Sequence, residues 1–165
     1  DAIAGLSAVT VASIQGHAIG GGFLLAAACD VRVAAHGTRF GLPEIDLGLP
    51  LTWGGVPLLC RQLGPSLAKD LVLTGRRFGT EDVNGIGYFH RVVEPEDLAT
   101  TTAEVVEQLR SKPALALSQI KAQFQQAMGV RDDGVSDEER FVQALKDPNF
   151  LANAMAYVQG LRKPR

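Results

Sequence analysis

The chain has 165 residues, of which 16 are basic and 18 acidic, so its formal net charge is -2. This balance gives no overall attraction to nucleic acid or to an anionic membrane surface, and we expect neither as a partner. The hydrophobic share of 46% and the charged share of 21% are typical of a globular domain. No uninterrupted apolar run approaches the roughly 18 residues of a membrane-spanning helix.

Two cysteines, Cys29 and Cys60, stand outside any C-x-x-C pair and are flanked by apolar residues. They are too few for a disulfide scaffold, so we interpret them as small buried residues of a protein in a reducing compartment. The predicted location is therefore cytoplasmic. The chain opens at Asp1 without a methionine, as if inside a folded element, and we expect it to be a fragment.

The first third of the chain has the pattern of a layered α/β core. A β-branched run at 8–14 stops at Gly16 and predicts a buried strand. The apolar segment 23–29 is rich in alanine and leucine and follows three glycines, which favours a buried helix. Residues 31–35 then predict another strand, and this strand–helix–strand order indicates parallel pairing.

From residue 51 the pattern becomes mostly helical. Helices are predicted at 54–63 and 65–73, each followed by a glycine that ends it. Thr80 is expected to cap a further turn, and 88–93 to form the last strand.

Everything after Pro95 is predicted to be helical, at 96–111, 114–128, 137–146 and 149–162. Ser136 and Glu139 have the spacing of a capping box, and Asp147 is predicted to cap the final helix with Pro148 at its first position. We therefore divide the chain into an α/β core, 1–95, and an α-helical region, 96–165.

The first segment that could carry chemistry is Gly16-His17-Ala18-Ile19-Gly20-Gly21-Gly22-Phe23, between a strand and a helix. Glycines let a ligand approach the backbone, and the start of a helix adds unpaired N–H groups and a positive dipole end. Such a turn can hold a developing oxyanion, although a tight turn without any ligand is the simpler alternative. The spacing fits neither a P-loop nor a dinucleotide fingerprint. The three histidines lack the spacing of metal ligands, and we expect no metal site.

The second segment is Phe40-Gly41-Leu42-Pro43-Glu44-Ile45-Asp46-Leu47-Gly48-Leu49. Glu44 stands among apolar and rigid neighbours, which disfavour the charged carboxylate and suit it to proton transfer. The alternative is a structural glutamate that caps a strand or pairs with Arg39. Asp46 is the weaker candidate, because turn chemistry accounts for it.

Taken together, these segments resemble the signature of the enoyl-CoA hydratase/isomerase family, the crotonase superfamily. The resemblance rests on Ala18 to Gly22, on Cys29-Asp30, and on Phe40 to Ile45 followed by Leu47-Gly48. The later blocks Leu73 to Phe78 and His90 to Val93 extend it along essentially the whole chain.

The resemblance implies the C-terminal part of a crotonase-like ββα spiral core, followed by helices that assemble trimers or cover the acyl pocket. It also implies an acyl-CoA or enoyl-CoA substrate, no separate cofactor because coenzyme A belongs to the substrate, and a homo-trimer or dimer of trimers. The Gly21 N–H would be one of two oxyanion donors, and Glu44 the carboxylate that moves a proton. Other residues implied to bind substrate are Ala18, Ile19, Gly20, Leu24, Pro43, Leu49, Leu51 and Thr52.

Two positions depart from the family pattern. Hydratases of the family carry a second glutamate two residues after the glycine triplet, where this chain has Leu24. Leucine cannot orient water, so double-bond isomerisation with one carboxylate is favoured over hydration. The loop Leu51-Thr52-Trp53-Gly54-Gly55 replaces a Pro-Gly-Ala before its two glycines. Trp53 therefore either reshapes the acyl pocket or is purely structural, and the sequence leaves both open.

The N-terminal half of the family, with the second oxyanion donor, is not found in these residues, so we predict little activity for the chain alone. Three further hypotheses stay open: an enoyl-CoA hydratase, a catalytically silent acyl-CoA-binding relative and, on the glycine turn alone, a nicotinamide oxidoreductase.

Overall fold

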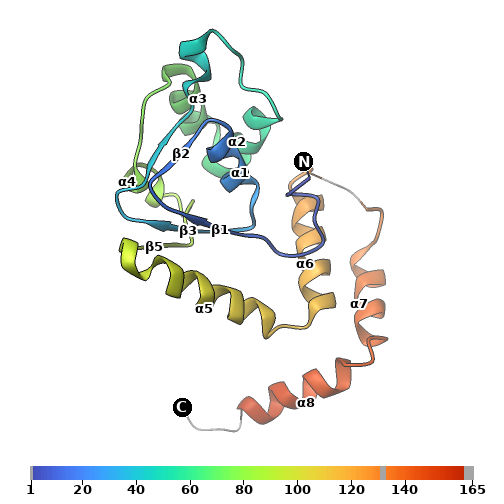
Figure 1. Cartoon of the computed structure of the whole chain (residues 1–165). Helices are drawn as coiled ribbons and strands as arrows, with labels where there is room; N and C mark the ends of the chain where they lie inside the picture. Colours follow the sequence, from blue (N-terminus) through green and yellow to red (C-terminus); the bar gives the residue numbers. More distant parts are fainter. Residues whose placement is uncertain (1, 131–132, 162–165) are drawn as a thin grey trace. The chain divides into compact units, whose positions relative to one another are not determined.

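The structure, a computed structural model, describes residues 2–130 and 133–161. It contains two compact units, Asp1–Gln108 and Leu109–Arg165 (Figure 1). The sequence-based division falls before helix α5 (Leu98–Arg110), whereas the two units divide near the end of that helix. The roles predicted for the two parts stay predictions.

The first unit contains two small parallel sheets. The strands of the larger sheet run in the order β1-β3-β5: β1 (Val11–Ile14), β3 (Val31–Ala35) and β5 (Arg91–Val93). The smaller sheet pairs β2 (His17–Ile19) with β4 (Arg39–Gly41). Between β2 and β3 lies helix α1 (Gly21–Ala28), so the predicted strand–helix–strand order is confirmed.

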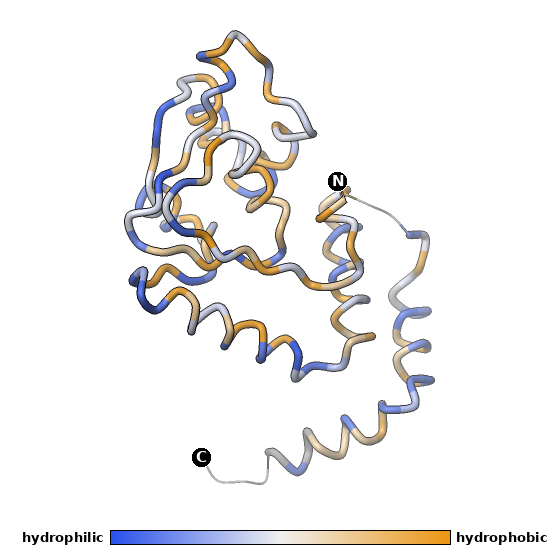
Figure 2. The backbone as a smooth tube through the Cα atoms, viewed as in Figure 1, coloured by the Kyte–Doolittle hydropathy of each residue, from blue (hydrophilic) through white to orange (hydrophobic). Residues whose placement is uncertain are grey.

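Successive side chains of β3 pack into two different cores, one on each face of the larger sheet. Val33 and Ala35 pack with Leu98 of α5 on one face. Ala34 belongs to the main core on the other face, together with Ile14 of β1 and Phe23 of α1. Because successive side chains of a strand point to opposite faces, a strand buried on both faces needs apolar side chains at successive positions, as at Val33, Ala34 and Ala35 of β3. These strands are largely apolar in Figure 2.

Aromatic rings fill the main core around Phe23. Its ring centroid lies 5.7 Å from that of Phe40, 5.2 Å from that of Phe78 and 5.5 Å from that of Tyr88. These separations are typical of favourable aromatic pairs. Phe40 and Phe78 also exchange both backbone hydrogen bonds, which ties β4 to the segment after the third helix.

The helices that follow the sheets are α2 (Gly55–Leu63), α3 (Pro65–Thr74) and α4 (Thr80–Asn84). The first two agree with prediction to within a residue at each end. The predicted N-cap at Thr80 is wrong, because Gly79 takes that place and donates its N–H to Asp82 at 2.8 Å. A short turn of helix, η2 (Pro95–Asp97), leads into α5.

Four strands differ from the prediction. The predicted strands 8–14 and 88–93 are shorter in the structure, and β2 and β4 were not predicted. Tyr88 and Phe89 are buried among the core aromatics outside the strand, so their apolar character reflects packing and not strand pairing. The two missed strands are three residues long each, too short for a periodic pattern.

The second unit contains α6 (Ala114–Ala127), α7 (Asp137–Leu145) and α8 (Phe150–Leu161). The capping box is confirmed, since Ser136 and Glu139 each accept the other's backbone N–H. The predicted cap at Asp147 is wrong, because α8 begins at Phe150 and Asp147 accepts from Asn149 in the preceding turn. The predicted helix end at Arg162 lies outside the described residues.

The second unit buries a charged side chain and exposes several large apolar ones. Arg140 is buried and forms an ion pair with Asp133 at 2.5 Å. In contrast, several large apolar side chains of its helices are more than half exposed, namely Phe124, Phe141, Leu151 and Met155. In the described part of the chain, no helix has both the length and the apolar character needed to cross a membrane.

Candidate active site

The glycine turn lies where strand β2 meets helix α1. Gly20 ends the strand by donating its N–H to the Gly41 carbonyl of β4 at 2.8 Å, and it caps α1 with φ 54° and ψ -122°. A residue with a Cβ rarely adopts this backbone conformation, so glycine is required at this position. The first N–H groups of a helix have no partner inside it, and the described residues provide no acceptor for that of Gly21.

Glu44 lies in a single turn of 3₁₀ helix, η1 (Pro43–Leu47), directly after β4. Leu42 is 1% exposed and anchors the segment in the core, while Pro43 takes the first helical position. The turn ends at Gly48, whose left-handed backbone lets its N–H and that of Leu49 return to the Glu44 carbonyl. Core packing before the turn and hydrogen bonds after it therefore fix the backbone of Glu44.

The Glu44 carboxylate lies against the glycine turn. Its Oε1 atom is 2.8 Å from the position that a Cβ on Gly20 would take, so no larger residue fits there without displacing it. Its Oε2 atom is buried and has no hydrogen-bond partner among the described residues. The alternative of an ion pair with Arg39 is not found between these two described residues. A buried carboxylate oxygen without a partner is unfavourable, so this atom calls for an explanation.

Trp53 lies on the other side of the same turn. A Cβ on Gly21 would lie 2.7 Å from its Cζ3 atom, which places the edge of the indole against the Gly21 backbone. The side chain is nevertheless 72% exposed. Glu44 and Trp53 thus contact adjacent glycines of one turn.

Leu24 is buried on α1 and packs against the loop that precedes α2. A Cβ on Gly55 would lie 3.1 Å from Leu24 Cδ1 and 2.8 Å from two side-chain carbons of Leu51. Gly55 was not singled out from the sequence, although the paired glycines Gly54 and Gly55 were the available signal. The position at which hydratases of the family carry a second glutamate is therefore an apolar contact in this chain.

The remaining residues predicted to bind substrate lie in strand β2 and in the loop between η1 and α2. Ala18 and Ile19 belong to β2, and Ala18 is buried in the core. Thr52 is exposed and contributes its carbonyl to the turn before α2, which the Gly55 N–H closes at 2.9 Å. The Leu49 side chain is 54% exposed. Among the described hydrogen bonds, the one between Leu49 and Glu44 joins their backbones.

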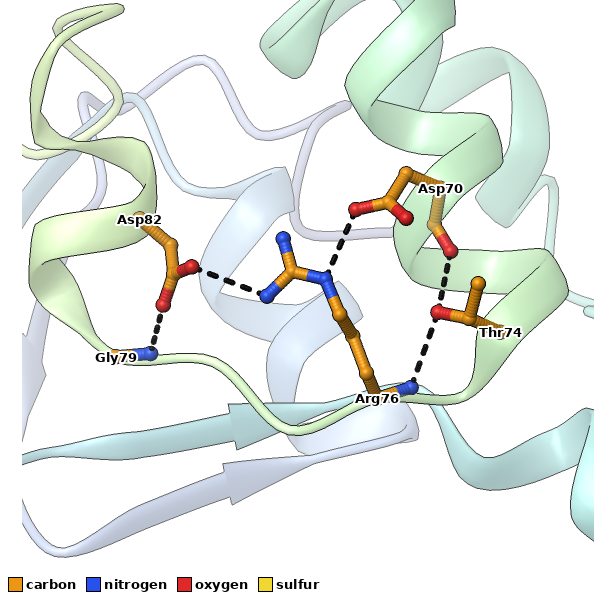
Figure 3. A network of polar contacts seen from close by, with 5 residues as sticks. All are labelled: Asp70, Thr74, Arg76, Gly79 and Asp82. Carbon is orange, nitrogen blue, oxygen red and sulfur yellow. Dashed lines mark hydrogen bonds and ion pairs between the residues drawn. The ribbon is translucent and has the colours of Figure 1, made fainter.

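The end of α3 supports the turn that carries Glu44. A Cβ on Gly75 would lie 3.1 Å from both Ile45 Cγ2 and Asp46 Oδ2, so η1 packs directly on this glycine. Next to it, Arg76 bonds Asp70 at 2.9 Å and Asp82 at 3.0 Å (Figure 3). The Gly79 N–H, and after it Arg76, lower the pKa of Asp82. This network connects α3 to α4 and holds the segment on which η1 rests.

A second polar cluster lies apart from the glycine turn. Arg32 is buried, donates to the carbonyls of Tyr88 and Cys29, and lies 4.6 Å from the Tyr88 ring centroid. Its backbone N–H donates to Nδ1 of His90, and burial together with the Arg32 charge lowers the pKa of His90. His90 is therefore a structural acceptor. No group of three potential metal ligands occurs in the part of the chain that the structure describes.

Comparison with known proteins gives one consistent family. The family model for enoyl-CoA hydratase/isomerase matches residues 1–146. A short-chain-enoyl-CoA hydratase of Clostridium acetobutylicum is 34% identical over 118 residues, which are 72% of this chain and 45% of that protein. The chain spans about half the length of the curated relatives it matches.

Solved structures give the same result. An enoyl-CoA hydratase subunit of Geobacillus kaustophilus is similar with a TM-score of 0.85 and 30% identity, over 99% of this chain and 64% of that one. A monofunctional enoyl-CoA isomerase of Mycobacterium smegmatis has a TM-score of 0.70 and 33% identity, over 85% of this chain and 64% of that one. The predicted crotonase-like α/β fold is thereby confirmed, and the chain belongs to the enoyl-CoA hydratase/isomerase family.

Proposed function

We propose that this chain carries the proton-transfer half of the active site of an acyl-CoA enzyme, which shifts the double bond of an enoyl-CoA thioester. The observation that carries the proposal is the position of Glu44. Its Oε2 atom is buried without a partner, and its Oε1 atom contacts Gly20, the residue before the unpaired N–H of Gly21. The proposed base thus contacts the residue next to the proposed oxyanion donor.

The chemistry follows from this pairing. Glu44 would take a proton from the carbon next to the thioester carbonyl of a 3-enoyl-CoA, and the electron pair would delocalise onto the carbonyl oxygen. The Gly21 N–H and the positive end of α1 would stabilise that oxygen. Glu44 would then return the proton to the fourth carbon, giving the 2-enoyl-CoA. One carboxylate suffices, and coenzyme A is part of the substrate, so the step calls for no cofactor.

Leu24 favours isomerisation over hydration. It is 6% exposed, and its side chain contacts Gly55 beside Leu51. An attacking water needs hydrogen-bond partners that place it, and these apolar side chains provide none. Hydration is the second candidate, because the curated relatives include enzymes named as hydratases. A catalytically silent acyl-CoA-binding relative is the third.

The test offers 3-enoyl-CoA and 2-enoyl-CoA separately to the longest protein that the gene encodes and follows the products by chromatography. We expect conversion of the 3-enoyl ester without formation of a hydroxyacyl ester. Glu44→Gln should lower this rate by about 10²–10⁴-fold, the usual contribution of a general base, while binding is retained. Asp46→Asn is the matched control, because it removes a carboxylate from the same turn.

The outcomes separate the candidates. Hydroxyacyl-CoA formed from the 2-enoyl ester would show that another group orients water and would refute the interpretation of Leu24. Saturable binding without turnover of either ester would favour the silent relative. A Glu44→Gln variant as fast as the parent protein would remove the assignment of the base.

We further propose that the active protein is a homo-trimer or a dimer of trimers. The support is the exposure of Phe124, Phe141 and Met155 on the second unit, since large exposed apolar side chains can mark a surface that faces a partner. Light scattering after gel filtration would measure the mass of the assembly, and a monomer would contradict the proposal. A separate preparation of residues 1–165, in the isomerase assay, tests the prediction that they alone turn over little substrate.

A further inference from the structure

Trp53 has an unusual backbone for its residue type. It is the one residue other than glycine with positive φ in the described part of the chain, at 57°, and Gly54 follows at 68°. The Gly55 N–H closes this turn on the Thr52 carbonyl at 2.9 Å. Positive φ at both central positions is the arrangement of a type I′ turn, which normally takes Asn, Asp or Gly. Backbone strain of this kind persists where the surroundings fix it, and such residues gather at functional sites.

Burial in the core does not explain why a tryptophan occupies position 53. A structural tryptophan normally lies mostly in the core, whereas 72% of Trp53 is exposed. Its six-membered ring instead contacts Gly21, with Cζ3 at 2.7 Å and Cη2 at 3.2 Å from the Cβ position. A strained backbone therefore holds a large exposed ring against the residue whose N–H faces the proposed thioester oxygen.

We propose that Trp53 determines acyl specificity by packing its indole against the planar part of the acyl group that is conjugated with the thioester in the dienolate and in the 2-enoyl product. This inference rests on the proposed function. A carbonyl oxygen bound at Gly21 brings the next acyl carbons close to that glycine, and the indole lies at the same residue. Flat π systems pack favourably against an aromatic ring, whereas the tetrahedral carbons of a saturated chain make fewer contacts with it. The chain would thus prefer conjugated enoyl or aromatic acyl thioesters to saturated ones.

The test measures binding without turnover, in the longest protein that the gene encodes with Glu44→Gln as background. Calorimetric titration gives dissociation constants for 2-butenoyl-CoA, for butanoyl-CoA and for coenzyme A alone. We expect the conjugated ester to bind about 2–12-fold more tightly than the saturated one, the range of aromatic pair energies. Trp53→Leu should remove this ratio and leave coenzyme A binding unchanged, and Trp53→Phe should restore most of it. Leu73→Ala, a similarly exposed apolar side chain on α3, is the control.

Trp53 is the one tryptophan of the 165 residues. The part of the fluorescence that Trp53→Leu removes gives an independent readout. That part should change on addition of 2-butenoyl-CoA and not on addition of coenzyme A alone. A conjugated-to-saturated ratio that survives in Trp53→Leu would overturn the inference and leave the proposed function standing. Equal weakening of coenzyme A and both esters would also overturn it, since the indole would then serve the coenzyme or the fold. Failure of every thioester to bind the folded protein would refute both proposals.

Discussion

Replacing each of the three consecutive glycines by alanine should give three different results, because the structure gives each one a different constraint. Gly20 has positive φ, and its Cβ would lie 2.8 Å from Glu44 Oε1. Gly21 has an ordinary helical backbone, but its Cβ would lie 2.7 Å from the Trp53 ring. Gly22 is helical, and nothing lies within 4 Å of its Cβ position.

The expected magnitudes follow from these constraints. Gly20→Ala should lower the free energy of unfolding by about 1–2 kcal/mol, since positive φ costs about 1–3 kcal/mol and alanine regains part of that by restricting the unfolded chain. Gly22→Ala should raise it by about 0.5–1 kcal/mol, the advantage of alanine over glycine in a helix. Gly21→Ala should change it little, because Trp53 is exposed enough to turn away. Gly21→Ala should instead lower turnover at the glycine turn.

Denaturant unfolding followed by circular dichroism measures the three stabilities, and the isomerase assay measures the site. We expect Gly20→Ala and Gly21→Ala to reduce turnover strongly, because one displaces the proposed base and the other adds a methyl group at the proposed oxyanion donor. Gly22→Ala should retain most of the activity. The reasoning would be refuted if Gly20→Ala proved as stable as the parent, or if Gly22→Ala were as destabilised as Gly20→Ala.

Four further predictions concern stability, each measured by denaturant unfolding. Trp53→Gly should stabilise the protein by up to about 1 kcal/mol, because relief of left-handed strain outweighs the entropy of glycine; a loss would contradict the strain. Because the pKa of His90 is lowered by burial and by Arg32, its contribution is complete above the unfolded value of about 6.5 and is lost as pH falls below it; His90→Asn should flatten that dependence. Arg32→Met should cost about 2–4 kcal/mol, since the Tyr88 carbonyl loses a buried donor, and a neutral result would argue against that bond. Arg76→Ala should cost at most about 1 kcal/mol, less at high salt, as exposed ion pairs do.

The parts of the fold that were predictable are those with a local cause. The helix α3 lies between Pro65 and Gly75, two residues that fix a helix start and a helix end. Strand β3 was predicted to the residue, because Val33, Ala34 and Ala35 form a short apolar run that is buried on both faces. The capping box at Ser136 depends only on residues three apart.

The parts that were missed depend on distant residues. Strand β4 exists because Phe40 pairs with Phe78 and Gly41 accepts from Gly20, and neither partner is visible in its own three residues. The same limit applies to the site. The sequence picked out Glu44 and Gly21, but Glu44 lies against the glycine turn because β2 and β4 lie side by side. The contact between Trp53 and Gly21 joins positions 32 residues apart, and no local sequence pattern predicts it.

The coincidence of several unfavourable features is the strongest argument for where the site lies. An unpartnered buried atom alone proves little, since the Tyr88 hydroxyl also lacks a partner among the described residues, and it lies within an aromatic core where burial raises its pKa. At the glycine turn three such features meet: an unpartnered oxygen of Glu44, an unpaired N–H of Gly21 and a strained, exposed Trp53. Natural sequences keep local conflicts few and place them where function requires them. A bound acyl thioester of the kind proposed would give all three a partner at once.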